Sequence, residues 1–102
     1  MNKNAKEIYD DVLAIVLDDY GLTIGEMFGT NRAECVNARQ SLIISLHDEG
    51  LSDSEIAELT QKMRRCSICI IRNKYNDKTA HWEVKHCIEL VKKMKKKNAL
   101  IS

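Results

Sequence analysis

Apolar residues recur along this chain at spacings of three and four, the period of a helix with one buried side. Between residues 6 and 20, aspartates occupy several of the positions between them. The apolar positions of this stretch are Ile8, Val12, Leu13, Val16 and Tyr20. The pattern predicts a first helix over residues 6–20, and Gly21 is a natural residue to end it.

Two further helices are predicted in the next part of the chain. Thr23 is the N-cap candidate of a short helix that Gly29 ends. Thr30 or Asn31 is the N-cap candidate of a long third helix that reaches about residue 47. The expected core residues of these two helices are Met27, Phe28, Val36, Leu42, Ile43, Ile44 and Leu46. Because the third helix is so apolar, we expect it at the centre of the fold.

The stretch from residue 51 to residue 75 predicts two short helices joined by a tight turn. Ser52 is an N-cap candidate, and Glu55 three residues later completes the pattern of a capping box. The apolar side of the first helix comprises Ile56, Ala57 and Leu59. After a turn at residues 61–63, one apolar stripe of the second helix comprises Ile68, Ile71 and Tyr75.

The second of these two helices is basic. Residues 61–75 contain no acidic side chain and five basic ones: Lys62, Arg64, Arg65, Arg72 and Lys74. A helix pair whose second member begins with basic residues is the sequence form of a DNA-binding helix-turn-helix. A solvated face on an all-α protein has the same pattern, so this stretch alone leaves both interpretations open.

A sixth helix is predicted from about residue 79 to residue 97. Asn76 and Asp77 interrupt the preceding helix, and Thr79 is the N-cap candidate. Its expected inner face comprises Trp82, Val84, Ile88, Val91 and Met94. The helix ends in the lysine-rich run KKMKKK. Those lysines favour the negative end of the helix dipole, and they are also able to contact phosphate.

These patterns predict an all-α fold of six helices, in one compact domain that spans residues 1–102, with the helix-turn-helix at about residues 52–76. Strand-like alternation is absent, and 102 residues suffice for one modest core. The net charge is only +1, but its distribution is uneven. Residues 1–30 contain two basic and six acidic side chains, and residues 76–102 contain seven basic and three acidic ones. Such asymmetry is typical of proteins that bind polyanions, and of charged outer helix faces.

The sequence contains neither a membrane span nor the apolar core of a signal peptide. We therefore expect a cytoplasmic protein whose cysteines are reduced. Free cysteine is a small residue that is often buried, and burial is the default expectation for all four thiols, Cys35, Cys66, Cys69 and Cys87.

From about residue 6 to residue 97, the chain resembles the C-terminal DNA-binding domain of the bacterial replication initiator DnaA. The resemblance rests on the order and spacing of Tyr20, residues 23–28, the loop at residues 29–32, Ala38-Arg39-Gln40 and Ser52-Asp53-Ser54-Glu55-Ile56-Ala57. The eleven-residue step from Ala57 to Ile68 is similar to the long turn of the DnaA motif. The resemblance implies a compact helix-turn-helix fold, like that of this family and of the Trp repressor, that binds double-stranded DNA.

The base-reading segment departs from the family. Gln61-Lys62-Met63-Arg64-Arg65-Cys66-Ser67-Ile68 stands where the family has Gly-Gly-Arg-Asp-His-Thr-Thr-Val. Ile70 replaces a later histidine that faces the bases, and the basic loop is reduced to Arg32. Asp53 places a negative charge where a helix N-terminus contacts phosphate in the family. The resemblance therefore implies the fold of the family with an altered DNA preference.

Ten residues are the candidate DNA contacts. Arg64 and Arg65 are placed to reach the major groove, where an arginine bonds a guanine edge twice. Ser67 suits either base or phosphate, and Cys66 and Ile70 face outward, toward thymine methyl groups or a protein partner. The candidates for phosphate contact are Lys62, Arg32, Arg39 and Arg72. The resemblance adds Asn37, which occupies the position from which some family members insert an arginine into the minor groove.

Other functions are weaker alternatives. The spacing of Cys66, Cys69, His81 and His86 lies one residue from that of a zinc finger, but both cysteines fall on a predicted helix. A CxxC pair that catalyses redox reactions would be expected beside a strand, with exposed, activated thiols. No phosphate-binding loop of the form GxxxxGK[ST] is present, and we expect neither an enzyme nor a bound metal or cofactor. The main rival to DNA binding is a protein-interaction module, or a homodimer, on the same fold. A repressor, a replication accessory and a mobile-element protein are equally compatible with the sequence.

Overall fold

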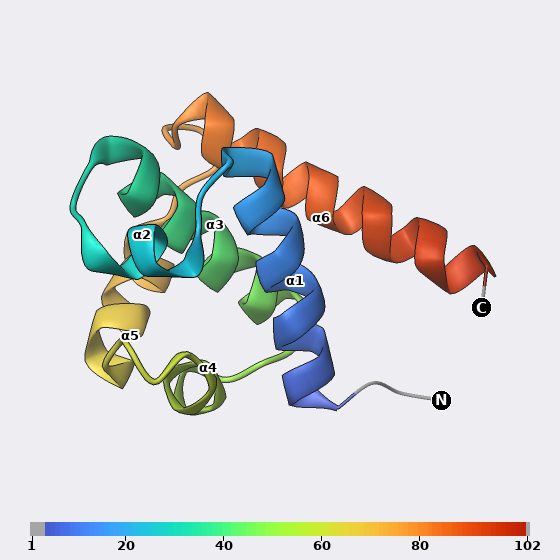
Figure 1. Ribbon diagram of the computed structural model, residues 1–102, viewed down its shortest axis with the longest axis horizontal. Helices are drawn as coiled ribbons and strands as arrows, with labels where there is room; N and C mark the ends of the chain where they lie inside the picture. The colour runs from blue at the N-terminus through green and yellow to red at the C-terminus, as the bar shows by residue number, and fades with distance from the viewer. Residues whose placement is uncertain (1–3, 102) are drawn as a thin grey trace.

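The computed structural model describes the backbone of residues 4–101 and the side-chain surroundings of residues 4–94. Over this part of the chain it contains α-helices and no strand, which confirms the all-α class (Figure 1). In chain order the helices are α1 (Ala5–Tyr20), α2 (Ile24–Gly29), α3 (Ala33–Asp48), α4 (Asp53–Thr60), α5 (Arg65–Lys74) and α6 (Trp82–Ile101). The last helix extends four residues beyond the end that the sequence pattern predicts.

Two of the predicted N-caps are confirmed as complete capping boxes. At α2 the backbone N–H of Glu26 donates to Thr23 Oγ1 at 3.2 Å, and the N–H of Thr23 donates to Glu26 Oε1 at 3.1 Å. Ser52 and Glu55 make the same reciprocal pair at α4, with distances of 3.2 and 3.0 Å. Each box satisfies two backbone donors that a helix N-terminus leaves open.

The predicted caps of α3 and α6 are wrong. Arg32 occupies the N-cap position of α3, and its guanidinium has no acceptor with which to cap the helix. The hydroxyl of Thr30 does not cap α3 either; it donates to the sulfur of Cys35 at 3.1 Å. At α6 the first turn begins later than Thr79, and His81 Nδ1 accepts from the backbone N–H of Glu83 at 3.2 Å. Both errors place the cap one to two residues too early on the chain.

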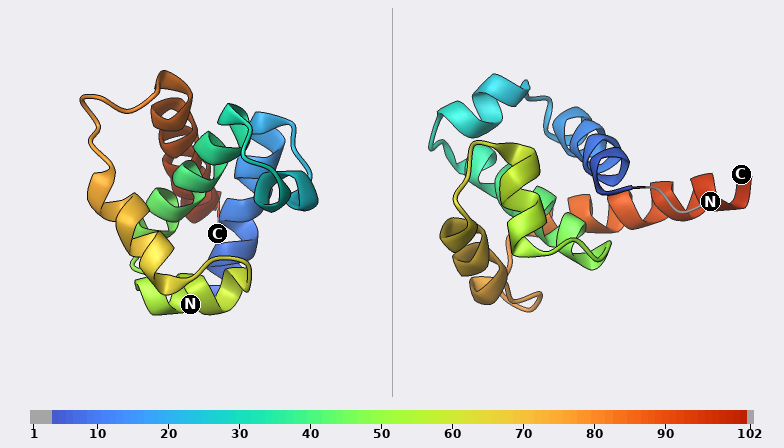
Figure 2. Two further views of the ribbon diagram at one scale, coloured as in Figure 1. Left: turned by 90° about the vertical axis from the view of Figure 1, so that its left-hand side faces the viewer. Right: turned by 90° about the horizontal axis from the view of Figure 1, so that it is seen from below.

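Helix α3 forms the centre of the fold, as its composition predicts. It packs against each of the other five helices, with α1 and α6 along one side and α4 and α5 toward the other (Figures 1 and 2). Residues 41–46 of α3 are all buried. The largest core side chains with less than 2% exposure include Met27, Leu42, Ile43, Leu46, Ile56 and Ile68. Burial of this apolar surface is the main stabilising contribution to the fold.

Three residues that the helical pattern assigns to the core are exposed: Val36 at 46%, Trp82 at 69% and Met94 at 42%. Val36 lies in the first turn of α3, where Cys35 is buried and its neighbours in the chain are exposed. Trp82 lies two positions from buried Val84 and so on the opposite side of α6. Met94 lies on α6 three residues after Val91, the last buried residue of that helix in the described range. The pattern also misses Tyr9, which is only 7% exposed.

A buried polar contact joins α1 to the middle of α3. The hydroxyls of Tyr20 and Ser41 share a hydrogen bond of 3.0 Å, and burial raises the pKa of Tyr20 to about 12. Burial likewise raises the pKa of the Cys87 thiol to about 12. A small second core cluster of Ile44, Val84 and Ile88 packs against Tyr75 and anchors the end of α5 between α3 and α6.

Candidate nucleic-acid interface

A four-residue turn joins α4 to α5 and determines how α5 is presented. Gln61 ends α4 in the left-handed conformation, with φ of 55°, and its backbone N–H donates to the carbonyl of Ala57 at 3.1 Å. Ile56 on α4 and Ile68 on α5 have no exposed surface. Both helices are therefore attached to the core by an isoleucine, which leaves the opposite side of α5 open to solvent.

An ion pair braces the two helices. Arg72 donates to Asp53 through Nε at 3.0 Å and through Nη2 at 2.8 Å, so the pair is bidentate. The side chains are only 30% and 15% exposed. Hydrogen bonding from Arg72 holds the pKa of Asp53 below its usual range. Because this guanidinium already pairs with a carboxylate of the protein, the prediction that Arg72 contacts phosphate is not retained.

Replacement of Asp53 by asparagine is expected to lower the melting temperature by a few degrees at pH 7, because Arg72 loses its anionic partner. The pKa of Asp53 is lower in the folded protein than in the unfolded chain, whose value is near 3.8. Its stabilising contribution is therefore present above that value and is lost as the pH falls through the folded pKa. Calorimetry at pH 7 and at progressively lower pH should show the two proteins converging.

The matched control for this change is Asp10→Asn. Asp10 pairs with Lys6 at 3.3 Å on α1, but these side chains are 56% and 73% exposed. Exposed pairs of this kind contribute little to stability. Equal effects of the two substitutions would show that the Arg72–Asp53 pair does not brace the helices.

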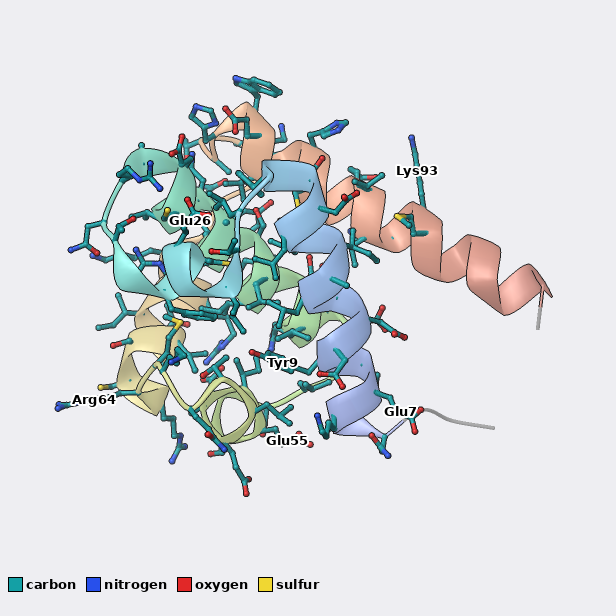
Figure 3. The ribbon with its side chains drawn as sticks, in the orientation of Figure 1. Glu7, Tyr9, Glu26, Glu55, Arg64 and Lys93 are labelled. Carbon is teal, nitrogen blue, oxygen red and sulfur yellow. The ribbon has the colours of Figure 1, made fainter. Side chains whose placement is uncertain are left out.

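Arg64 and Arg65 lie at the start of α5 and are exposed to solvent. Arg64 occupies the N-cap position and makes no side-chain capping bond. Figure 3 shows its side chain directed away from the body of the fold. The side chains of Arg64 and Lys62 have no ion pair within residues 4–94. The first turn of α5 therefore presents exposed positive charge.

A hollow of about 510 Å³ lies between α3, the turn and α5. We call it the basic groove, and its lining comprises Arg39, Lys62, Met63, Arg64, Ser67, Ile70 and Ile71. Arg39 is held at its edge, because Nη2 donates to the Thr30 carbonyl at 2.8 Å and to Asn31 Oδ1 at 3.3 Å. The lining has three cationic side chains and no carboxylate.

Five of the ten candidate contacts thus meet at one place: Arg39, Lys62, Arg64, Ser67 and Ile70. Arg65 and Cys66 lie beside the groove on the exposed part of α5. The expectation that Cys66 is buried is therefore wrong. Arg32 pairs with Glu26 at 3.3 Å and with Glu34 at 3.4 Å. Asn37 is half-buried and outside the lining of the groove.

The sequence interpretation missed two apolar residues of the groove, Met63 and Ile71. Met63 is the one apolar residue in a polar turn, and that contrast is a signal for a packed or functional position. Ile71 was assigned to the buried stripe, and it is in fact only partly buried. Both side chains also pack against the main hydrophobic core, so they connect the groove to it.

The described residues include neither a cluster of side chains that could hold a metal ion nor a helix that could cross a membrane. Among residues 4–94, no three histidine, cysteine, aspartate or glutamate side chains are close enough together to hold a metal ion. The spacing of Cys66, Cys69, His81 and His86 therefore does not correspond to an assembled zinc finger. None of the described helices has the length and apolar character needed to cross a membrane.

Comparison with known proteins supplies no relative. No protein-family model, curated protein or solved structure matches the chain. The resemblance to the DnaA domain consequently remains a hypothesis that rests on the order and spacing of sequence motifs.

Proposed function

We propose that this protein binds double-stranded DNA, with the α4–α5 pair as a helix-turn-helix and the first turn of α5 directed at the major groove. The observation that supports this most is the basic groove. Its cations come from two places far apart in the chain, Arg39 on α3 and the pair Lys62 and Arg64 in the turn. A groove with cations and no carboxylate suits the phosphate backbone of a nucleic acid.

Within this proposal the residues of the basic groove, together with Arg65 beside it, divide into two roles. Arg64 and Arg65 reach base edges, because an arginine at the start of a recognition helix bonds guanine O6 and N7 together. Ile70 is 52% exposed and offers an apolar contact for a thymine methyl group. Arg39 and Lys62 contact phosphates, which set the register on the duplex without reading sequence.

The charge of the neighbouring surface supports the same orientation. The hollow on the other side of α4, toward α1, contains Glu55 and Glu58 with Lys6 as its single cation. On α1, Asp10, Asp18 and Asp19 are exposed. A polyanion approaching the protein would be repelled from these carboxylates and attracted to the basic groove.

The test is the salt dependence of duplex binding. If the protein neutralises three or four phosphates, its affinity for the duplex should fall about 40- to 150-fold between roughly 50 and 200 mM monovalent salt, because binding releases cations from the DNA. Fluorescence anisotropy of a labelled duplex measures this directly. An affinity that does not change over this range contradicts the proposal. Selection of bound oligonucleotides from a random pool at the same two salt concentrations would define the preferred sequence.

In this proposal the protein is an accessory or regulatory factor, without catalytic activity, that acts on DNA in the cytoplasm. The divergence from the DnaA signature at Arg64, Arg65 and Cys66 implies a target sequence different from the DnaA box. The oligonucleotide selection tests this point, because enrichment of the DnaA box itself would contradict it.

A second candidate is a protein-interaction module on the same fold. It is favoured by the exposed apolar side chain of Ile70, which lies one turn from exposed Cys66 on α5. Apolar residues at the centre of an exposed helix face are typical of protein interfaces. This candidate predicts weak, salt-insensitive interaction with duplex DNA, so the anisotropy experiment separates the two functions.

A further inference from the structure

Two of the four thiols lie together on the exposed part of α5. Cys66 is exposed and Cys69 is partly exposed, whereas Cys35 and Cys87 are buried with no accessible surface. A separation of three residues places Cys66 and Cys69 on the same side of the helix, one turn apart. A reagent in solution therefore reaches one neighbouring pair of thiols and no other.

The sulfur of Cys69 is part of the network that braces α4 to α5. Asn73 Nδ2 donates to it at 3.3 Å, and Arg72 Nη2 donates to it at 3.7 Å. The same Nη2 atom bonds Asp53 at 2.8 Å. Any reaction that moves the Cys69 sulfur therefore acts on a contact of the Arg72–Asp53 pair.

The Asp53 carboxylate lies near Cys69 but is paired with Arg72, and the other charged side chains of α5 and its preceding turn are basic. Arg64 and Arg65 directly precede Cys66, and residues 61–76 include no acidic side chain. Oxidised glutathione is a small disulfide with a net negative charge at neutral pH. Cationic surroundings raise the local concentration of an anionic reagent, and so favour this disulfide over a neutral one.

We propose that Cys66 and Cys69 form a reversible thiol–disulfide site whose oxidant is a small anionic disulfide such as oxidised glutathione. The thiolate of Cys66 attacks one sulfur of glutathione disulfide, which forms a mixed disulfide and releases one glutathione. The thiolate of Cys69 then attacks Cys66 Sγ, which forms the Cys66–Cys69 bond and releases the second glutathione. Overall, the two protein thiols are oxidised to one disulfide and the glutathione disulfide is reduced to two glutathione thiols. Two electrons and the two thiol protons pass from the protein to glutathione.

Closure of this bond alters the first turns of α5. Side chains one turn apart on a helix have Cβ atoms about 5–6 Å apart, whereas a disulfide requires about 3.5–4.5 Å. The helix must tighten between Cys66 and Cys69, and the Cys69 sulfur must leave Arg72 and Asn73. Ser67 lies within this segment, and Arg65 directly precedes it. This part of the inference rests on the proposed DNA binding: oxidation is expected to weaken it about tenfold, comparable to the loss of one base contact.

The chemical step is tested first, without DNA. The full chain is incubated with oxidised glutathione, and its intact mass is measured before and after treatment with dithiothreitol. The expected product has lost two hydrogen atoms, and peptide mapping after alkylation locates the bond at Cys66–Cys69. The variants Cys66→Ser and Cys69→Ser should each instead retain one bound glutathione. Retention of glutathione without closure in the unsubstituted protein would overturn the proposal, as would a disulfide that involves Cys35 or Cys87.

The effect on DNA is measured second, with the reduced protein as reference. Oxidation should lower the affinity of the unsubstituted protein about tenfold, and the Cys66→Ser/Cys69→Ser double variant should not respond to the oxidant. A closed disulfide with unchanged DNA affinity overturns the coupling. If the reduced protein does not bind DNA at all, the proposed function fails, and the mass measurement still decides whether the thiol site exists.

Discussion

Replacement of Arg64 and Arg65 together by alanine should weaken duplex binding by roughly 30-fold or more, because each base contact by arginine contributes about 1–3 kcal/mol. Both side chains are exposed, and the side chain of Arg64 makes no capping hydrogen bond at the start of α5. Their removal is therefore expected to leave the unfolding transition almost unchanged. Anisotropy of a labelled duplex and thermal unfolding by circular dichroism measure the two effects separately.

The matched control removes the same charge from elsewhere on the surface. Lys78 precedes α6, and Lys93 projects from α6 on the side away from α5 (Figure 3); both are exposed. The double variant Lys78→Ala/Lys93→Ala should lose only a small, nonspecific part of its affinity. Equal losses of DNA affinity in the two double variants would mean that net charge governs binding and that α5 is not the recognition helix.

Leu42→Ala is expected to destabilise the fold by about 3–5 kcal/mol, the cost of deleting a buried leucine side chain and leaving a cavity. Leu42 has no exposed surface and lies on α3, which packs against all five other helices. A domain of this size has a total stability of about 5–15 kcal/mol, so the loss is a large fraction of it. Urea unfolding, with the midpoint and slope fitted together, measures the change.

Val36→Ala on the same helix is the control. Val36 is 46% exposed, so its truncation removes little buried surface, and the change in stability should stay within about 0.5 kcal/mol. The simple helical pattern assigns both residues to the core and predicts large effects for both. A large loss for Val36→Ala would show that the first turn of α3 is covered in solution.

Much of the helical structure is readable from short segments of sequence. Thr23 with Glu26, and Ser52 with Glu55, form their capping boxes through hydrogen bonds that span three residues. Such bonds depend on the local chain alone, which explains why these two predictions are confirmed. Thr79 was misassigned because a threonine in a turn has other partners; its hydroxyl lies 3.5 Å from the Asn76 carbonyl.

The candidate interface was only partly predictable. The sequence indicates that Lys62, Arg64 and Ser67 lie near one another, because they fall in one turn and the helix that follows it. It does not indicate that Arg39, more than twenty residues earlier, joins them at the same groove. It also assigns Arg72 to phosphate contact, whereas the folded chain pairs Arg72 with Asp53, nineteen residues away.

The sequence by itself determined the helical class, the approximate bounds of the helices and the central place of α3. These follow from the spacing of apolar residues and from hydrogen bonds within one turn of the chain. Only the tertiary structure decided that Val36 and Trp82 are exposed, and that Arg64 remains open to solvent while Arg72 does not. Burial and ion pairing depend on which helices lie against each other, and that is set by residues distant in the chain.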